Sequence, residues 1–268
     1  MGNAFAAYEK IDQEKLAQLS TRHAWIVEPI FHASSSVLNM PFFSWVKRIQ
    51  SPQEFGRVAV QLYYHSATFP KAMGLMLAIG GMSENYMMTF YSKHAFNEAD
   101  HHEMLMKWML KHGILSSRSE INTVIPTIET NACVNYAYQM ALEQDRDKWL
   151  VGLNSGIERC SNDFFRVVAP KLHSLGAGDE YFDVHVEADE HHSIMGLEYV
   201  PEHDPNSFRG RQLIIKALEG ISLWAAMLHS WIGIDLLPKF DLSGNWITLN
   251  TANALSNKKT EEKEHELV

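Results

Sequence analysis

The chain has 268 residues, 46% of them apolar and 11% aromatic, and a formal charge of −9 at neutral pH. This composition is typical of a globular protein with a sizeable core, and the negative charge argues against a general nucleic-acid binder, which needs a basic surface. Only two cysteines occur, Cys133 and Cys160, so the sequence offers neither a disulfide framework nor a cysteine-based zinc site and favours a reducing compartment.

The N-terminal residues show no basic region followed by a long apolar run, and no uninterrupted apolar stretch reaches membrane-spanning length. We therefore expect a soluble, cytoplasmic protein with neither a membrane nor a nucleic acid as partner. The sequence does not distinguish a monomer from a homodimer.

The first strong helix signal lies at residues 51–54. Ser51 can cap a helix, Pro52 suits its first position, and Glu54 completes a capping box. The apolar pattern continues from there to the glycines at residues 80–81, and Pro70 should kink this helix.

Capping residues and glycines mark the later helices as well, beginning with Ser83, Asp179 and Ser207. Strand signals are sparse, and no period-two runs are bounded by hairpin dipeptides. The predicted helices cover about residues 84–112, 128–173 with a break near 145–147, 180–199 and 207–233. The sequence thus predicts one all-α domain of about seven or eight helices over residues 1–256, followed by a charged tail, residues 257–268, that we expect to be disordered.

The strongest chemical signal is a row of polar residues in the predicted helix 180–199. His185, Asp189 and His192 stand at positions i, i+4 and i+7 and therefore share one helix face. Two imidazoles and a carboxylate form a set that Fe(II) accepts, with positions left open for oxygen. The alternative is a solvated polar face, but the neighbouring residues leave no clean apolar stripe that would turn His185 away from the interior.

Two weaker signals lie upstream. Glu98 and His101 form the Glu-x-x-His pair used by di-iron carboxylate proteins, and His102 is an alternative partner at i+4. Taken alone, this pair is more typical of a solvent-exposed helix face. Because the chain also has a second helix with two histidines and an aspartate, the pair instead favours a metal site. Glu158 lies in the middle of a predicted helix, where a bare carboxylate is costly to bury unless it binds a metal or pairs with a cation such as Arg159.

Together these signals supply three imidazoles and three carboxylates. That number suits two iron ions bridged by a carboxylate and is too large for a single zinc ion. The candidate ligands are Glu98, His101, Glu158, His185, Asp189 and His192.

Other classes of site have less support. Neither cysteine lies in a nucleophile motif, and the chain has no Gly-rich phosphate loop and no G-x-S-x-G motif. His65, His94 and Lys71 are isolated polar residues on apolar helices, which we interpret as hydrogen-bonded core or pocket residues. Lys71 could also pair with a substrate carboxylate and is our candidate substrate-binding residue.

The order of these motifs resembles that of the heme-oxygenase-like di-iron oxidases, a superfamily that uses the heme oxygenase helical fold without heme. The layout is most similar to that of the bacterial medium-chain fatty acid decarboxylase that makes terminal alkenes. In that enzyme the Glu-x-x-His helix also ends in His-Gly twelve residues after the ligand histidine, as between His101 and Gly113 here, which favours His101 over His102. The resemblance covers roughly residues 55–235.

The resemblance implies that the six candidate residues bind two Fe(II) ions and that O2 is a co-substrate. It further implies a small carboxylate-bearing substrate, a fatty acid or an amino acid, and C–C bond cleavage or oxidative rearrangement in biosynthesis. The chain departs from the decarboxylase in one respect, because that enzyme has an additional carboxylate on the earlier kinked helix. This chain has no acidic residue between Glu54 and Glu84 and offers Gln61, His65 and Lys71 in that region.

Two alternatives remain open at this point. A metal-free enzyme of the thiaminase II or quinone-cofactor-synthase kind could use the same architecture and would require Cys133 to approach Glu158. A non-enzymatic helical bundle that binds a partner would leave the face of His185, Asp189 and His192 exposed on the surface.

Overall fold

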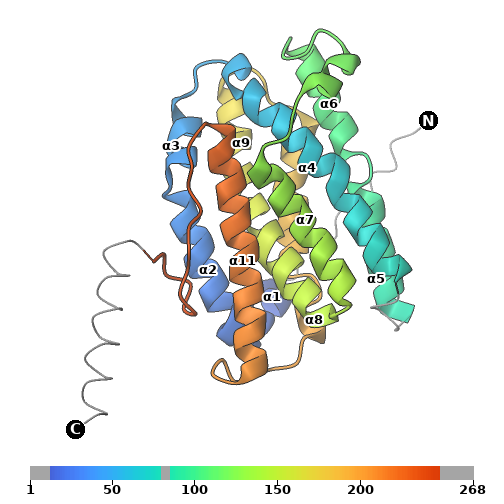
Figure 1. Ribbon diagram of the computed structural model, residues 1–268, viewed down its shortest axis with the longest axis vertical. Coiled ribbons are helices and arrows are strands. Elements are labelled where there is room, and N and C mark those ends of the chain that lie inside the picture. Colours follow the sequence, from blue (N-terminus) through green and yellow to red (C-terminus); the bar gives the residue numbers. More distant parts are fainter. Residues whose placement is uncertain (1–12, 80–84, 248–268) are drawn as a thin grey trace.

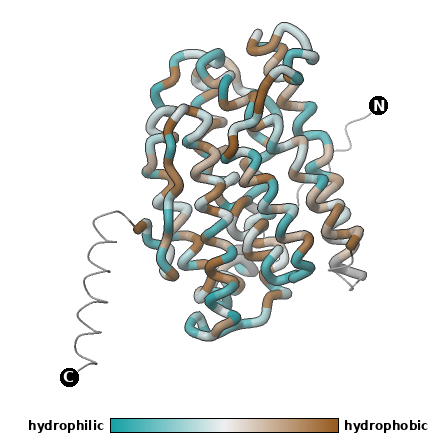
Figure 2. Tube along the Cα trace, in the orientation of Figure 1, coloured by the Kyte–Doolittle hydropathy of each residue, from teal (hydrophilic) through white to brown (hydrophobic). Residues whose placement is uncertain are grey.

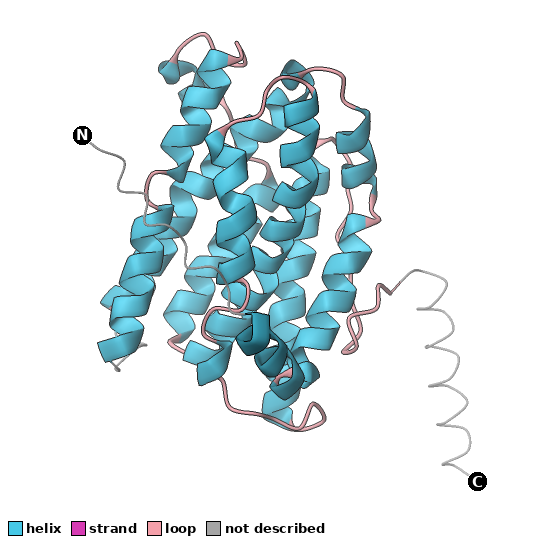
Figure 3. Cartoon of the chain, turned by 180° about the vertical axis from the view of Figure 1, so that it is seen from behind, coloured by secondary structure: helices cyan, strands magenta, loops and turns pink. Residues whose placement is uncertain are grey.

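The computed structural model describes residues 13–79 and 85–247 of the chain. Over this range the regular structure is helical, and Figure 3 shows no strand arrow among the described residues. The predicted all-α fold class is therefore confirmed. The predicted tail, residues 257–268, lies outside the described residues, as do Ser83 and the glycines at 80–81.

The helices pack as one bundle (Figure 1). The α-helices are α1 (Gln13–Arg22), α2 (Ala24–Leu38), α3 (Pro41–Arg48), α4 (Pro52–Ala78), α5 (Asn85–Glu98), α6 (His101–Lys111), α7 (Ile128–Glu143), α8 (Arg146–Trp149), α9 (Arg159–Ser174), α10 (Glu180–His192) and α11 (Phe208–Trp231). A π-helix, η2 (Leu150–Glu158), connects α8 to α9, and two short 3-10 helices are η1 (Arg118–Thr123) and η3 (Leu197–Tyr199).

Several helix boundaries follow directly from the capping chemistry. The Ser51 side chain accepts a hydrogen bond from the Glu54 backbone N–H at the start of α4, and Ser207 does the same for Gly210 at the start of α11. α6 ends at Lys111, and Gly113 follows with a φ of 67°. These start and stop predictions are confirmed.

Two predicted helices are divided or shortened. The expected helix 84–112 is interrupted at residues 99–100, so that Glu98 ends α5 and His101 begins α6. The expected helix 180–199 ends as α10 at His192, and its last part is the 3-10 helix η3. Gly196, with a φ of 85°, makes the turn between the two because this conformation is strained for other residues.

α11 is the central helix of the bundle. It runs between α2 and α7 (Figure 1) and packs closely on η2. Small residues make this approach feasible: a Cβ at Gly156 would lie 3.0 Å from the Ala217 carbonyl oxygen, and one at Gly220 would lie 3.0 Å from the Gly152 carbonyl oxygen. All nine residues of η2 are buried, and this segment ends at Glu158.

α11 is also long and apolar enough to cross a membrane by length and composition, but 72% of its most apolar window is buried inside the protein. Figure 2 shows hydrophilic residues interspersed with hydrophobic ones along the helices. This pattern is that of a core helix packed against neighbours within the protein.

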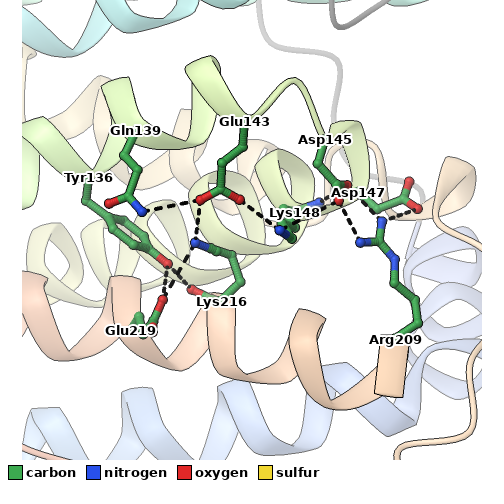
Figure 4. Close-up of polar contacts among 9 residues, drawn as sticks. All are labelled: Tyr136, Gln139, Glu143, Asp145, Asp147, Lys148, Arg209, Lys216 and Glu219. Carbon is green, nitrogen blue, oxygen red and sulfur yellow. Dashed lines mark hydrogen bonds and ion pairs between the residues drawn. The ribbon is translucent and has the colours of Figure 1, made fainter. Parts of the chain in front are cut away.

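A cluster of charged residues joins the end of α7 and the start of α8 to α11 (Figure 4). Lys216 of α11 lies 2.9 Å from Glu143, and Arg209 donates two hydrogen bonds to Asp145, at 2.6 and 2.8 Å. This charged cluster fixes the chain just before η2 against the central helix.

Candidate metal centre

Three separate segments contribute the six predicted ligands. Glu98 and His101 lie at the junction of α5 and α6, Glu158 ends the π-helix η2, and α10 carries His185, Asp189 and His192. All six are between 1% and 8% exposed. The alternative in which the α10 residues form a solvated surface face is therefore wrong.

Glu98, His101 and His185 form the first of two ligand groups, with one donor atom from each lying within 4.8 Å of the others. Glu98 Oε2 is 2.8 Å from His101 Nδ1, and the His101 and His185 rings are 4.3 Å apart between centroids. His185 Nδ1 lies 2.5 Å from the Tyr181 carbonyl oxygen, so Nδ1 carries the proton that it donates there. This hydrogen bond leaves the Nε2 lone pair for a metal ion.

The second group lies on the other side of Glu98. His94, Glu98 and His192 also have donor atoms within 4.8 Å of one another. Glu158 joins them, because Oε1 lies 3.2 Å from His94 Nε2 and Oε2 lies 3.5 Å from His192 Nδ1. Asp189 Oδ1 is 3.9 Å from the same His192 nitrogen.

Glu98 belongs to both groups through different oxygens. Oε2 faces His101, whereas Oε1 lies 3.5 Å from His192 Nδ1 and 4.0 Å from His94 Nε2. A carboxylate placed in this way has the arrangement of a bridging ligand. The lack of an acidic residue on α4 after Glu54 therefore does not leave the centre without a carboxylate between the two groups.

The electrostatics of the buried carboxylates depend on their neighbours. Burial by itself would raise the pKa of Glu98, but His101, His192 and His185 outweigh it and hold the pKa well below its usual range. Burial, together with repulsion from Glu98 and Glu158, raises the pKa of Asp189 well above its usual range. Burial also raises the pKa of Glu158, although His94 opposes the change.

The imidazoles differ in the same way. Burial and the nearby His101 lower the pKa of His185 to about 3, so this ring is neutral and able to bind a metal at neutral pH. Burial would lower the pKa values of His94 and His101 as well, but Glu158 and Glu98 respectively reverse the change.

Whether the centre fits a metal can be judged from its buried oxygen and nitrogen atoms. Several of these potential metal-ligand atoms lack a hydrogen bond among the described residues. They are Oε1 of Glu98, Oδ2 of Asp189 and Nδ1 of His94. Leaving such atoms unsatisfied is costly, and three clustered carboxylates repel one another. A divalent cation in each ligand group would bind these unsatisfied atoms and remove the repulsion between the carboxylates. The set of ligand atoms therefore fits a two-metal centre.

Of the remaining predicted residues, His102 is half-buried and lies beside Glu103, outside both ligand groups. Lys71 is exposed on α4 and does not line the cavity at the centre. His94 was interpreted as a core residue and not as a ligand, yet the structure places it in the second group. Its spacing of four residues before Glu98 was the available signal.

A small cavity of about 30 Å³ adjoins the ligand groups. α4 contributes His65, Ser66 and Phe69 to its wall, and Phe165 and Trp224 also line it. The His65 ring stacks on Phe69 with centroids 5.4 Å apart, and burial lowers its pKa to about 4, so His65 is neutral at neutral pH. The cavity has room for a molecule the size of water or dioxygen.

Comparison with known proteins places this centre in context. Residues 57–225 match the model of a family described as iron-containing redox enzyme. No curated protein matches the chain significantly.

Two crystal structures are similar in fold. One is a domain of unknown function with a heme oxygenase-like fold from Shewanella denitrificans, with a TM-score of 0.60 and 18% identity, covering 83% of this chain and 92% of that one. The other is a TenA homolog from Pseudomonas syringae, with a TM-score of 0.64 and 14% identity, covering 87% of this chain and 98% of that one. At these identities the likeness shows the heme oxygenase-like fold alone.

Proposed function

Because the chain belongs to the family of iron-containing redox enzymes, we propose that it is an O2-dependent oxidase with a non-heme di-iron centre. The observation that carries the proposal is the pair of buried ligand groups that share Glu98. Two Fe(II) ions bound there would supply the electrons for reduction of O2. The ligands would be the six predicted from the sequence: Glu98, His101, Glu158, His185, Asp189 and His192.

The surrounding protein orients the ligands and keeps the centre dry. The Tyr181 carbonyl fixes the His185 tautomer, and the Phe165 ring stacks on His185 with centroids 4.3 Å apart and an interplanar angle of 22°. His65, neutral at the edge of the cavity, is placed to accept or donate a hydrogen bond to a polar group of a bound substrate. The apolar wall excludes bulk water from the reacting groups.

We propose a small carboxylate-bearing substrate, a fatty acid or an amino acid, with C–C bond cleavage or oxidative rearrangement in biosynthesis. The similarity of motif layout to the medium-chain fatty acid decarboxylase supports this choice, as do the 13 methionines and 13 phenylalanines that favour an apolar pocket. The cavity of about 30 Å³ is smaller than such a substrate, so binding requires side chains around it to move. Lys71 remains the proposed carboxylate anchor, which requires the substrate to enter along the exposed face of α4. We further propose a cytoplasmic location.

Anaerobic titration with Fe(II), followed by measurement of oxygen uptake in the presence of fatty acids and amino acids, tests the proposal. We expect two ions per chain in the wild type and a loss of iron binding in His185→Ala and His192→Ala. His102→Ala serves as the matched control, since His102 neighbours a predicted ligand but lies outside both groups, and it should bind iron as the wild type does. Activity that survives in a chain with no bound iron would eliminate the oxidase.

The metal-free alternative on the same fold has a specific obstacle. It needs Cys133 as a reactive thiol near Glu158, but Cys133 is buried on α7 and is not part of the cavity wall. Burial raises the pKa of its thiol to about 12, so the reactive thiolate is scarce at neutral pH. The same titration separates the two, because the alternative predicts turnover that chelators do not reduce.

A further inference from the structure

The two helical segments that carry most of the centre repeat one pattern. His94, Glu98 and His101 stand at i, i+4 and i+7, and His185, Asp189 and His192 stand at the same spacing on α10. On α10 this spacing places the three side chains on one helix face. In the other segment Glu98 ends α5 and His101 begins α6, yet the structure brings both His94 and His101 beside Glu98.

The structure brings these two rows together in opposite directions. The first imidazole of one row lies against the last of the other: the His94 and His192 rings are 4.0 Å apart, and the His101 and His185 rings are 4.3 Å apart. The arrangement is approximately two-fold, and in it His94 is the counterpart of His185. His185 belongs to the predicted ligand set, whereas His94 does not.

The surroundings of His94 match a ligand better than a structural core histidine. The side chain is completely buried, and its Nδ1 makes no hydrogen bond among the described residues. Its Nε2 points at the second group, 3.2 Å from Glu158 Oε1 and 4.0 Å from Glu98 Oε1. By comparison, the equally buried His229 has its Nδ1 at 2.6 Å from the Ala225 carbonyl oxygen.

We propose that His94 is a seventh protein ligand and binds the second metal ion together with His192, Glu158 and the shared Glu98. Each ion then has two imidazoles, His101 and His185 at the first position and His94 and His192 at the second. The inference rests on the proposed di-iron function and adds to it the composition of the second position.

A competing role for His94 is to donate a hydrogen bond that orients Glu158 without touching the metal. The two roles predict different results for conservative replacements. His94→Gln keeps an N–H donor near Glu158 but removes the imidazole, so it should preserve an orienting role and not a ligand role. Loss of an orienting partner typically weakens metal binding by about 10- to 100-fold.

The experiment is an anaerobic Fe(II) titration with a competing chelator, applied to the wild type, His94→Ala, His94→Gln and the control His102→Ala. We expect two ions in the wild type and the control. In both His94 variants we expect the first ion to bind with unchanged affinity and the second to be weakened by more than about 100-fold. Circular dichroism of the metal-free variants checks that each is folded, and His94→Gln, which is closer in volume, provides the result should the alanine variant unfold.

Each result has a distinct meaning. Tight binding of two ions by His94→Gln, or by both variants, would overturn the ligand role of His94 while leaving the di-iron function intact. A wild-type chain that binds no iron would overturn the proposed function and this inference together.

Discussion

Glu98 is the residue that the two proposed metal positions share, because its two carboxylate oxygens face different ligand groups. Replacement of Glu98 by alanine should therefore abolish binding of both ions. Asp189→Ala should weaken only the second, since Asp189 Oδ1 lies 3.9 Å from His192 Nδ1 and Asp189 is not a member of the first group. Metal content after anaerobic loading and desalting measures both effects.

Glu103→Gln is the control for this comparison. Glu103 is a carboxylate on α6 that pairs with Arg118 outside the centre, so its loss should leave the metal content unchanged. One ion retained in Glu98→Ala would mean that Glu98 does not bridge the two positions.

Most of the candidate site could be predicted from sequence because metal ligands on helices obey a fixed angular spacing. His185, Asp189 and His192 share a face at any helix position, and the structure places them with Glu98 and Glu158. Taken alone, His94 resembles a core or pocket histidine, although it forms the same spacing with Glu98 and His101. Residue spacing within one helix does not show which separate helices come together, so the meeting of α5, α6, η2 and α10 could not be predicted in this way.

Among the elements, the π-helix η2 is where packing and chemistry are most closely linked. Gly156→Ala would place a Cβ 3.0 Å from the Ala217 carbonyl oxygen, a backbone atom that cannot move independently of α11. We expect a loss of about 1–3 kcal/mol in the free energy of unfolding and weaker binding of the second ion, because Glu158 is only two residues away. Denaturant unfolding and metal titration measure the two effects.

Gly74→Ala on α4 is the matched control, since a Cβ there would have no neighbour within 4 Å. It should stabilise the protein by about 0.4–1 kcal/mol through the entropy of the unfolded chain. Equal stability of the two variants would show that η2 and α11 are not in close contact.

The charged cluster before η2 gives a prediction that depends on pH. Burial would raise the pKa of Asp145, but the hydrogen bonds from Arg209 outweigh it and lower the pKa. A lowered carboxyl pKa stabilises the fold above the unfolded value and loses that effect as pH falls through the folded value. Arg209→Gln should thus lower the free energy of unfolding by roughly 1–3 kcal/mol at neutral pH.

The difference between Arg209→Gln and the wild type should begin to shrink as the pH falls below about 4, the pKa of an aspartate in the unfolded chain. It should disappear only at a pH below the lowered folded pKa of Asp145 in the wild type. Thermal unfolding across this pH range measures it. A difference that is constant with pH would assign the effect to lost packing of the Arg209 side chain.

Helix starts and ends could be predicted where side chains specify them, as with Ser51 and Ser207. The division between α5 and α6 could not, because residues 99–100 are Ala99 and Asp100, with neither proline nor glycine to mark a break. The π-helix η2 could not be predicted from the sequence either. η2 packs against α11, and a sequence pattern does not record that contact.

At the scale of the whole molecule, the metal centre joins elements that are far apart in the chain, and metal binding should therefore stabilise the complete fold. The unfolded chain cannot present the ligands together, so each bound ion favours the native state. We expect the midpoint of thermal unfolding to rise with Fe(II) concentration. At a free Fe(II) concentration of a hundred times the dissociation constant, one bound ion should add about 2.7 kcal/mol to the free energy of unfolding.

Calorimetry under anaerobic conditions checks this dependence. His185→Ala, which we expect to lose iron binding, should show no such rise. An unfolding midpoint that is the same with and without Fe(II) would indicate that the metal does not bind the native state. The overall fold itself was predictable because helix signals recur throughout the chain and strand signals do not.

The order in which the ribosome makes the chain has a consequence for iron acquisition. Glu98 and His101 are synthesised early, but their partners on α10 follow more than eighty residues later. A nascent chain that stops before residue 192 holds only fragments of the donor set. The proposed donor set is therefore complete only once residue 192 has been made and α10 has packed beside the α5–α6 junction, so we expect iron to bind late in synthesis or after it.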